Sequence, residues 1–168
     1  MSGKLHQVFV GMGSNLGDRF NTLTAAIDRL ARSPMIFDVE TSSFYETDPV
    51  GGIEQPLFLN LVASFKSSLS PEETLEKLLE VEKFFGRVRD VRWGPRSLDL
   101  DLLIYEGQTR RTPLLTLPHP RMLERAFVVL PFRELLGSLR FESMRWDELR
   151  KQLDVPIATN GVRLYPVR

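Results

Sequence analysis

The sequence contains no cysteine and only two histidines, His6 and His119. The lack of cysteine excludes disulfide bonds and thiolate metal sites, and it agrees with a reducing compartment. No apolar run approaches the roughly 18 to 20 residues that a membrane-spanning helix needs. The stretch that follows Met1 also lacks the apolar character of a signal peptide. We therefore expect a cytoplasmic protein with no membrane partner.

An excess of either charge is also missing, because 22 Lys and Arg residues balance 22 Asp and Glu residues. The molecule as a whole has no electrostatic reason to bind a nucleic acid or an anionic membrane, so any anion site must be local. The 168 residues, 42% of them hydrophobic, are sufficient for one buried core. We expect a single domain over residues 1–168 and a monomer.

Four segments are typical of β-strands, and two others repeat apolar residues at helical spacing. In chain order these are strand 6–13, helix 20–31, strands 36–46 and 57–67, helix 70–86 and strand 98–105. The second helix opens with Ser70-Pro71-Glu72-Glu73, which has the residues of a capping box with proline at the first helical position. The order β-α-β-β-α-β predicts an α+β, ferredoxin-like fold: an antiparallel sheet with helices on one face and an open, ligand-binding face.

Proline and glycine interrupt the regular pattern in two places. Residues 47–56 are rich in both and predict a long loop between the two middle strands. Beyond Tyr105, the chain is broken up by Pro113, Pro118, Pro120 and Pro131. We expect one more helix over residues 146–153, and residues 136–168 form a C-terminal extension to which the sequence assigns no role.

Alternate side chains of a strand share a face, and this rule separates polar from apolar residues on the last predicted strand. The residues expected to face the helices are Leu98, Leu100, Leu102 and Ile104. Asp99 and Asp101 then point to the opposite face, where Phe58 and Asn60 of strand 57–67 also project. Two carboxylates one pleat apart repel each other unless a cation lies between them, and oxygen ligands suit Mg²⁺. The alternative is the solvated outer face of an amphipathic strand.

Four arginines lie within ten residues just before that strand. They are Arg87, Arg89, Arg92 and Arg96, and Trp93 lies among them. Guanidinium groups bind phosphate through paired hydrogen bonds, so this loop favours a polyphosphate ligand. Alternatively, the arginines serve only solubility and Trp93 only anchors the loop.

Three further positions carry weaker signals. Glu82 falls on the buried stripe of the second helix near its C-terminal end, where the helix dipole disfavours an anion. This suggests a ligand contact, unless the last turn frays into solvent. His119 is held between two prolines, and Arg125 and Phe127 follow closely. A structural histidine and a core phenylalanine are the alternatives.

Taken together, these residues resemble the 6-hydroxymethyl-7,8-dihydropterin pyrophosphokinase family. The segments that carry the resemblance are 10–18, 43–47, 58–60, Glu82, 86–89, 92–101, 118–121 and 125–127. The most specific is Trp93-Gly94-Pro95-Arg96-Ser97-Leu98-Asp99-Leu100-Asp101. The resemblance covers roughly residues 7–135 and implies the same ferredoxin-like fold.

The resemblance implies an enzyme that transfers the diphosphate of ATP to the hydroxyl of 6-hydroxymethyl-7,8-dihydropterin, releasing AMP, in folate biosynthesis. It implies two Mg²⁺ ions held by Asp99 and Asp101, which with Arg87 and Arg96 are the expected catalytic residues. The positions implied for ATP binding are Glu82, Arg87, Arg89, Trp93, Arg96, Thr116, His119 and Arg125. Those implied for the pterin are Thr47, Val50, Phe58, Asn60 and Phe127.

Two other functions share parts of this pattern. Gly11-x-Gly13 follows a strand, as in a dinucleotide-binding loop, but the third glycine is Gly17 rather than residue 16. An RNA-binding module can use the same fold, but Asp99 and Asp101 would repel a phosphate backbone. No P-loop lysine motif is present, so an ATP site must be of another type.

Overall fold

The computed structural model of the protein describes residues 3–86, 97–138 and 141–167. One antiparallel sheet forms its centre. Its strands are β1 (His6–Ser14), β2 (Ile36–Thr41), β3 (Tyr45–Thr47), β4 (Phe58–Ser67), β5 (Asp99–Tyr105) and β8 (Val162–Leu164). They lie in the order β5-β1-β4-β3-β8, and β2 pairs with β4 as well. The long strand expected over residues 36–46 is therefore two strands, which pair with opposite ends of β4.

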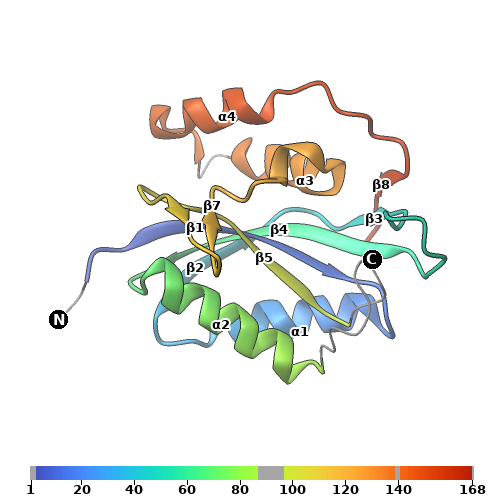
Figure 1. Ribbon diagram of the computed structural model, residues 1–168, viewed down its shortest axis with the longest axis horizontal. Coiled ribbons are helices and arrows are strands. Elements are labelled where there is room, and N and C mark those ends of the chain that lie inside the picture. The colour runs from blue at the N-terminus through green and yellow to red at the C-terminus, as the bar shows by residue number, and fades with distance from the viewer. Residues whose placement is uncertain (1–2, 87–96, 139–140, 168) are drawn as a thin grey trace.

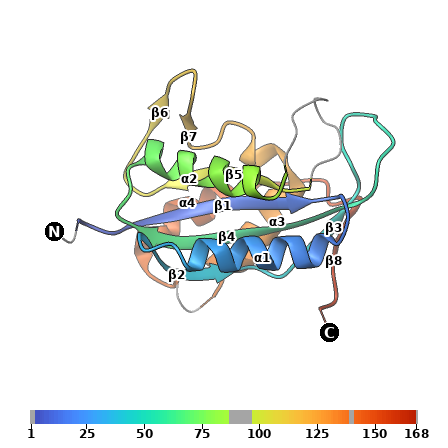
Figure 2. The same ribbon diagram turned by 90° about the horizontal axis from the view of Figure 1, so that it is seen from below.

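Two helices, α1 (Arg19–Ala31) and α2 (Pro71–Phe84), cover one face of the sheet (Figure 2). The core on this side is apolar and takes in Val8, Val10, Met12, Leu23, Leu59, Leu61, Leu78 and Leu100. At the start of α2, the Ser70 hydroxyl accepts a hydrogen bond from the Glu73 amide at 3.1 Å, and the Glu73 carboxylate accepts one from the Ser70 amide at 2.8 Å. The expected α+β class, the antiparallel sheet and the capping box are confirmed.

The other face of the sheet also carries helices, which were not predicted from the sequence. Figure 1 shows α3 (Ala126–Leu136) and α4 (Asp147–Leu153) on the side opposite α1 and α2. A second core forms there, in which Phe9, Val62 and Leu103 of the sheet pack with Val128 and Phe132 of α3. The expectation of an open face is wrong at this end, because these apolar residues require cover. The expected last helix, over residues 146–153, is confirmed by α4.

Pro131 lies inside α3 rather than ending it. A proline in a helix interior removes one backbone hydrogen bond. Phe132 and Val129 beside it are fully buried, and Pro131 itself is buried. Burial of this apolar face offsets the lost hydrogen bond, which is why the helix continues through the proline.

A bulge in β5 corrects one side-chain placement. Phe9 of β1 pairs with Ile104, but the next residue, Val10, pairs with Leu102, so Leu103 is inserted. Alternation holds from Leu98 to Leu102, as expected, and then shifts by one residue. Ile104 was expected to face α1 and α2, but it packs against the cluster beneath α3.

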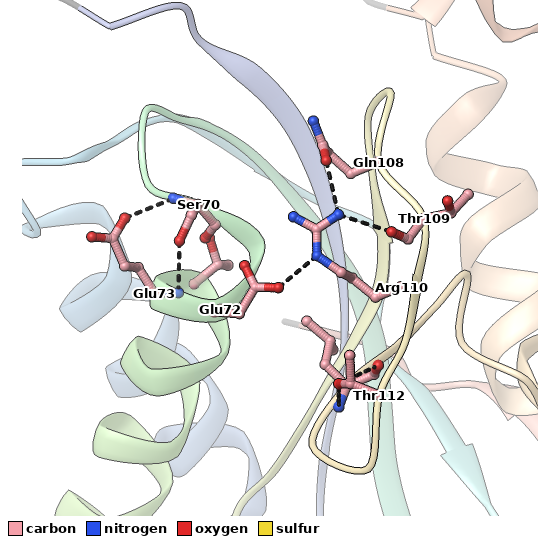
Figure 3. Close-up of polar contacts among 9 residues, drawn as sticks. Ser70, Glu72, Glu73, Gln108, Thr109, Arg110 and Thr112 are labelled. Carbon is pink, nitrogen blue, oxygen red and sulfur yellow. Dashed lines mark hydrogen bonds and ion pairs between the residues drawn. The ribbon is translucent and has the colours of Figure 1, made fainter.

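A small hairpin, β6 (Arg110–Arg111) and β7 (Thr116–Leu117), is attached to the start of α2 (Figure 3). The Arg110 guanidinium lies 2.5 Å from the Glu72 carboxylate and also donates hydrogen bonds to Gln108 and to the Thr109 carbonyl. The hydrogen bond that Arg110 donates to the Glu72 carboxylate lowers the pKa of Glu72. Two short 3-10 helices, η1 (Met122–Glu124) and η3 (Met144–Trp146), complete the described elements. Within the described ranges, no helix has the length and apolar character needed to cross a membrane.

Candidate active site

A cleft lies on the α3 side of the sheet, where β1, β4 and β5 run next to one another. It is lined by Gly11, Met12, Gly13, Asn60, Leu61, Asp99, Asp101, Phe127 and Val128. Four of the residues singled out from the sequence thus meet in one place: Asn60, Asp99, Asp101 and Phe127. They come from three separate elements, β4, β5 and α3.

Two glycines of β1 form the floor of this cleft. Gly11 pairs with Asp101 and Gly13 pairs with Asp99, and on its other side Gly13 pairs with Asn60. The central strand therefore has no side chain between the two aspartates and the amide. This role of the glycines was not predicted from the sequence, although the alternation of glycine with Val10 and Met12 was a signal for it. Because both glycines lie within a strand, the dinucleotide-binding alternative is wrong.

The amide of Asn60 is fixed by its neighbours. Its Nδ2 donates a hydrogen bond of 2.7 Å to the hydroxyl of Thr47 on β3, and both residues are buried. Its Oδ1 lies over Gly13, where an added Cβ atom would be only 2.4 Å away. A side chain at residue 13 would displace the amide, so Gly13 is needed for this arrangement.

The acidic side of the cleft is balanced by an arginine. The Arg125 guanidinium lies 3.6 Å from the Asp101 carboxylate, and the two side chains are 19% and 33% exposed. Arg125 is the residue that precedes α3, and its guanidinium lies 5.7 Å from the centroid of the Phe127 ring. The start of α3 thus brings a cation and an aromatic ring to the carboxylates of β5.

The donor set at Asp99 and Asp101 fits Mg²⁺. Both are alternate residues of β5, both are partly exposed, and both supply hard oxygen ligands. In the described ranges, no group of three or more His, Cys, Asp or Glu side chains could hold a metal on its own. Mg²⁺ commonly takes one or two carboxylates and completes its shell with water and substrate phosphate, so this pair suits a metal that arrives with a nucleotide.

His119 is held near this site by its backbone and by its ring. Its amide donates a 2.8 Å hydrogen bond to the Leu103 carbonyl, and its Nδ1 accepts one of 3.1 Å from the Arg121 amide. The neutral ring therefore carries its proton on Nε2. Burial lowers the pKa of His119, the positive charge of Arg125 lowers it further, and Asp99 partly opposes them.

Comparison with known proteins gives the same family as the sequence motifs. The family model described as 7,8-dihydro-6-hydroxymethylpterin-pyrophosphokinase (HPPK) matches residues 9–137. The chain belongs to this family. The expected family is confirmed, and with it the enzyme class: a pyrophosphokinase of folate biosynthesis that uses ATP as co-substrate.

Relatives support this membership over most of the chain. A Bacillus subtilis protein named 2-amino-4-hydroxy-6-hydroxymethyldihydropteridine pyrophosphokinase is 42% identical over 135 residues, covering 80% of this chain and 81% of its own. A Pseudomonas aeruginosa protein of the same name is 41% identical over 141 residues, covering 84% and 87%. The Plasmodium falciparum HPPK-DHPS structure with pteroate matches with a TM-score of 0.62 at 12% identity, which supports the fold alone. That match covers 80% of this chain but only 39% of the longer Plasmodium chain.

Other positions implied by the HPPK resemblance lie outside the cleft lining. Phe58 begins β4 on the same face as Asn60, and the Val50 side chain is 49% exposed in the loop between β3 and β4. Thr116 is exposed on β7. Glu82 is only 2% exposed, so the expectation that it lies on the buried side of α2 is confirmed and fraying is excluded. Arg87, Arg89, Trp93 and Arg96 lie outside the described residues.

Not every apolar residue near Glu82 is buried. Leu79 is 36% exposed, whereas Val81 is fully buried. The buried side of α2 therefore runs through Leu78, Val81 and Glu82. A carboxylate on this buried side, in the last turn of the helix, remains a candidate ligand contact.

Proposed function

We propose that this HPPK transfers the β,γ-diphosphate of ATP to the hydroxyl of 6-hydroxymethyl-7,8-dihydropterin and releases AMP. The observation that carries the proposal is the cleft in which two carboxylates, an amide and a phenyl ring meet over a floor of glycines. The two carboxylates suit a metal-bound polyphosphate, and the amide and the phenyl ring suit a flat heteroaromatic ring. The relatives named for this reaction, at about 40% identity, support the same assignment.

The nucleotide half of the proposed site lies around β5. Asp99 and Asp101 would hold Mg²⁺, two ions by the family resemblance. When bound, Mg²⁺ neutralises the charge on the phosphates and polarises the bond that breaks. Arg125 can bind phosphate oxygens through paired hydrogen bonds, and His119 offers the proton on Nε2 as a further donor. The resemblance adds Arg87, Arg89, Trp93 and Arg96 for ATP, with Glu82 and Thr116 at the nucleoside.

The pterin half of the proposed site lies toward β4 and α3. Phe127 would stack on the pterin ring, which is worth about 1 kcal/mol beyond burial of area, and Phe58 would lie on its other side. The Asn60 amide presents a donor and an acceptor that suit the edge of the ring. The backbone around Thr47 and Val50 would contact the remaining edge of the pterin ring.

These residues act chiefly by positioning. Phosphoryl transfer needs little covalent help from a protein. Most of the reduction in the activation barrier comes from holding the hydroxyl in line with the β-phosphorus and from balancing the charge of the phosphates. Phe127 and Asn60 would fix the acceptor, while Arg125 and His119 would fix the phosphates. The glycine floor, which has no side chains of its own, would allow the two substrates to approach each other closely.

The proposal is tested by the products of the purified protein with Mg²⁺, ATP and 6-hydroxymethyl-7,8-dihydropterin. We expect pterin-dependent release of AMP, which Asp99→Ala or Asp101→Ala abolishes while circular dichroism stays unchanged. Asp147→Ala, which removes an exposed carboxylate on α4, is the matched control and should retain activity. ADP as the sole nucleotide product, or no turnover with the pterin, would contradict the proposal.

A further inference from the structure

The C-terminal segment of the described chain runs beside the loop that joins β3 to β4. Strand β8 pairs with β3, with Val162 opposite Thr47 and Arg163 opposite Glu46. Figures 1 and 2 both show β8 against β3, at the side of the sheet from which this loop extends. The family model matches only residues 9–137, so β8 lies outside the matched region.

The first end of the loop is attached directly to the C-terminal segment. The Asp48 amide donates a 2.8 Å hydrogen bond to the Gly161 carbonyl, and the Arg163 guanidinium lies 3.4 Å from the carboxylates of both Asp48 and Glu46. Gly161 has a φ of +79°, and a Cβ atom added there would lie 2.6 Å from the Asp48 carboxylate. Asp48 is therefore packed directly on the backbone of Gly161.

The second end of the loop is connected to the same cluster through α1. The other oxygen of Glu46 pairs with the Arg19 guanidinium at 2.8 Å, and Arg19 also donates a 3.0 Å hydrogen bond to the Leu57 carbonyl. Asn15 holds the chain just before this point, through hydrogen bonds of 2.9 Å to Gln55 and 3.0 Å to the Pro56 carbonyl. Glu46 thus joins Arg163 at one end of the loop to Arg19 at the other.

We propose that residues 159–165 are a positioning element for the pterin-binding side of the active site. The inference rests on the proposed function, in which the backbone around Thr47 and Val50 reads the edge of the pterin. Thr47 is 2% exposed, holds the Asn60 amide and directly precedes Asp48, so a shift of Asp48 is transmitted to the pterin contacts. A loop held before binding loses less conformational entropy when the ligand arrives. The C-terminal segment thereby strengthens binding of the pterin and leaves binding of ATP unchanged.

Gly161→Ala tests the packing of Asp48, and the chain provides a close control. Gly107 has a similar φ of +73°, but nothing lies within 4 Å of an added Cβ atom. Gly107→Ala therefore introduces the same backbone strain without displacing a neighbour. Arg163→Met removes both ion pairs at the loop, and Arg32→Met removes an exposed pair with Asp28 at 3.1 Å on α1 as its control.

Two measurements separate positioning from a general loss of stability. Hydrogen exchange of the ligand-free protein should show faster exchange at Asp48 and across residues 49–57 in Gly161→Ala and Arg163→Met than in their controls. Steady-state kinetics should show a rise in KM for the hydroxymethylpterin of about fivefold to tenfold, with KM for ATP within twofold.

The inference is overturned if loop exchange and pterin KM in both variants equal those of the controls. It is also overturned if KM rises equally for both substrates together with a drop in melting temperature, which indicates a structural role only. Absence of pterin turnover in the unmodified protein would instead contradict the proposed function. The exchange measurement remains informative in that case, because it needs no substrate.

Discussion

Gly13 is the residue on which the pterin side of the site depends most directly. An alanine Cβ atom would lie 2.4 Å from the Asn60 Oδ1, so the amide must move and its hydrogen bond to Thr47 is lost. A hydrogen bond of this kind contributes about 1 kcal/mol to stability. We expect Gly13→Ala to raise KM for the pterin about tenfold or more, measured by AMP release.

Gly11→Ala is the stability control for Gly13→Ala, because it adds the same methyl group to the same strand. An added Cβ atom at Gly11 would meet Leu103 at 3.7 Å and Asp101 at 3.9 Å, which are ordinary contacts. We expect the free energy of unfolding of Gly11→Ala, from urea denaturation, to stay within about 0.5 kcal/mol of that of the unmodified protein.

Equal pterin KM values for Gly13→Ala and the unmodified protein would show that the Asn60 amide is not required.

His119 gives a prediction about pH. Burial and Arg125 lower its pKa, so in NMR titrations we expect a value below the ordinary value of about 6.5. The neutral ring stabilises the fold above the ordinary pKa, and this stability is lost as the pH falls through the lowered pKa. Nucleotide phosphates near the ring favour its cation, so ATP with Mg²⁺ should raise the pKa. His6→Gln assigns the signal, and a ligand-free pKa at or above 6.5 would contradict the prediction.

At the scale of elements, α2 is fixed by its own first turn. The Ser70 hydroxyl and the Glu73 carboxylate each accept a hydrogen bond from the backbone of the other residue. Loss of an N-cap side chain costs about 1 kcal/mol. We expect Ser70→Ala to reduce the free energy of unfolding by about this amount in urea denaturation, whereas Glu73→Gln, which keeps an acceptor, should reduce it less. Equal losses in the two variants would contradict this expectation and would indicate that the Glu73 charge contributes as much to stability as the Ser70 hydroxyl.

The elements that could be predicted are those with local signals. Helical spacing and the capping box indicated α1 and α2, and β-rich runs indicated β1, β4 and β5. Helix α3 was missed because Pro131 suggests a break, and only burial against the sheet shows that the helix continues. The bulge at Leu103 and the pairing of β8 with β3 depend on contacts between distant segments, which leave no periodic pattern in the sequence.

The residues of the site can also be divided into those that local sequence patterns predicted and those that depend on contacts between distant segments. Strand alternation placed Asp99 and Asp101 on one face with Asn60, and the pairings through β1 bring them together. The floor formed by Gly11 and Gly13 was missed, because a glycine has no side chain whose chemistry attracts notice. The position of Phe127 could not be predicted from residue type, since it follows from where α3 packs.

At the scale of the whole molecule, both helical layers and the C-terminal segment meet one sheet. The cleft lies beside the first turn of α3, and its residues come from elements that are far apart in the chain. Because β4, β5 and α3 each contribute to it, a ligand in the cleft contacts parts of both cores. Ligand binding should therefore stabilise the entire fold, since a ligand that binds only the folded state shifts the unfolding equilibrium.

ATP with Mg²⁺ at a hundred times its dissociation constant adds about 2.7 kcal/mol of stability, which corresponds to a rise in melting temperature of about 5 to 10 °C. We expect this rise in differential scanning fluorimetry, and we expect EDTA to remove most of it. Asp101→Asn should abolish the rise while leaving the ligand-free melting temperature within a few degrees, because its pair with Arg125 is partly exposed and long. Asp147→Asn, which weakens an exposed pair on α4, should keep the full rise. An undiminished rise in Asp101→Asn would mean that the nucleotide is held without this carboxylate, and the assignment of β5 to the metal site would then be wrong.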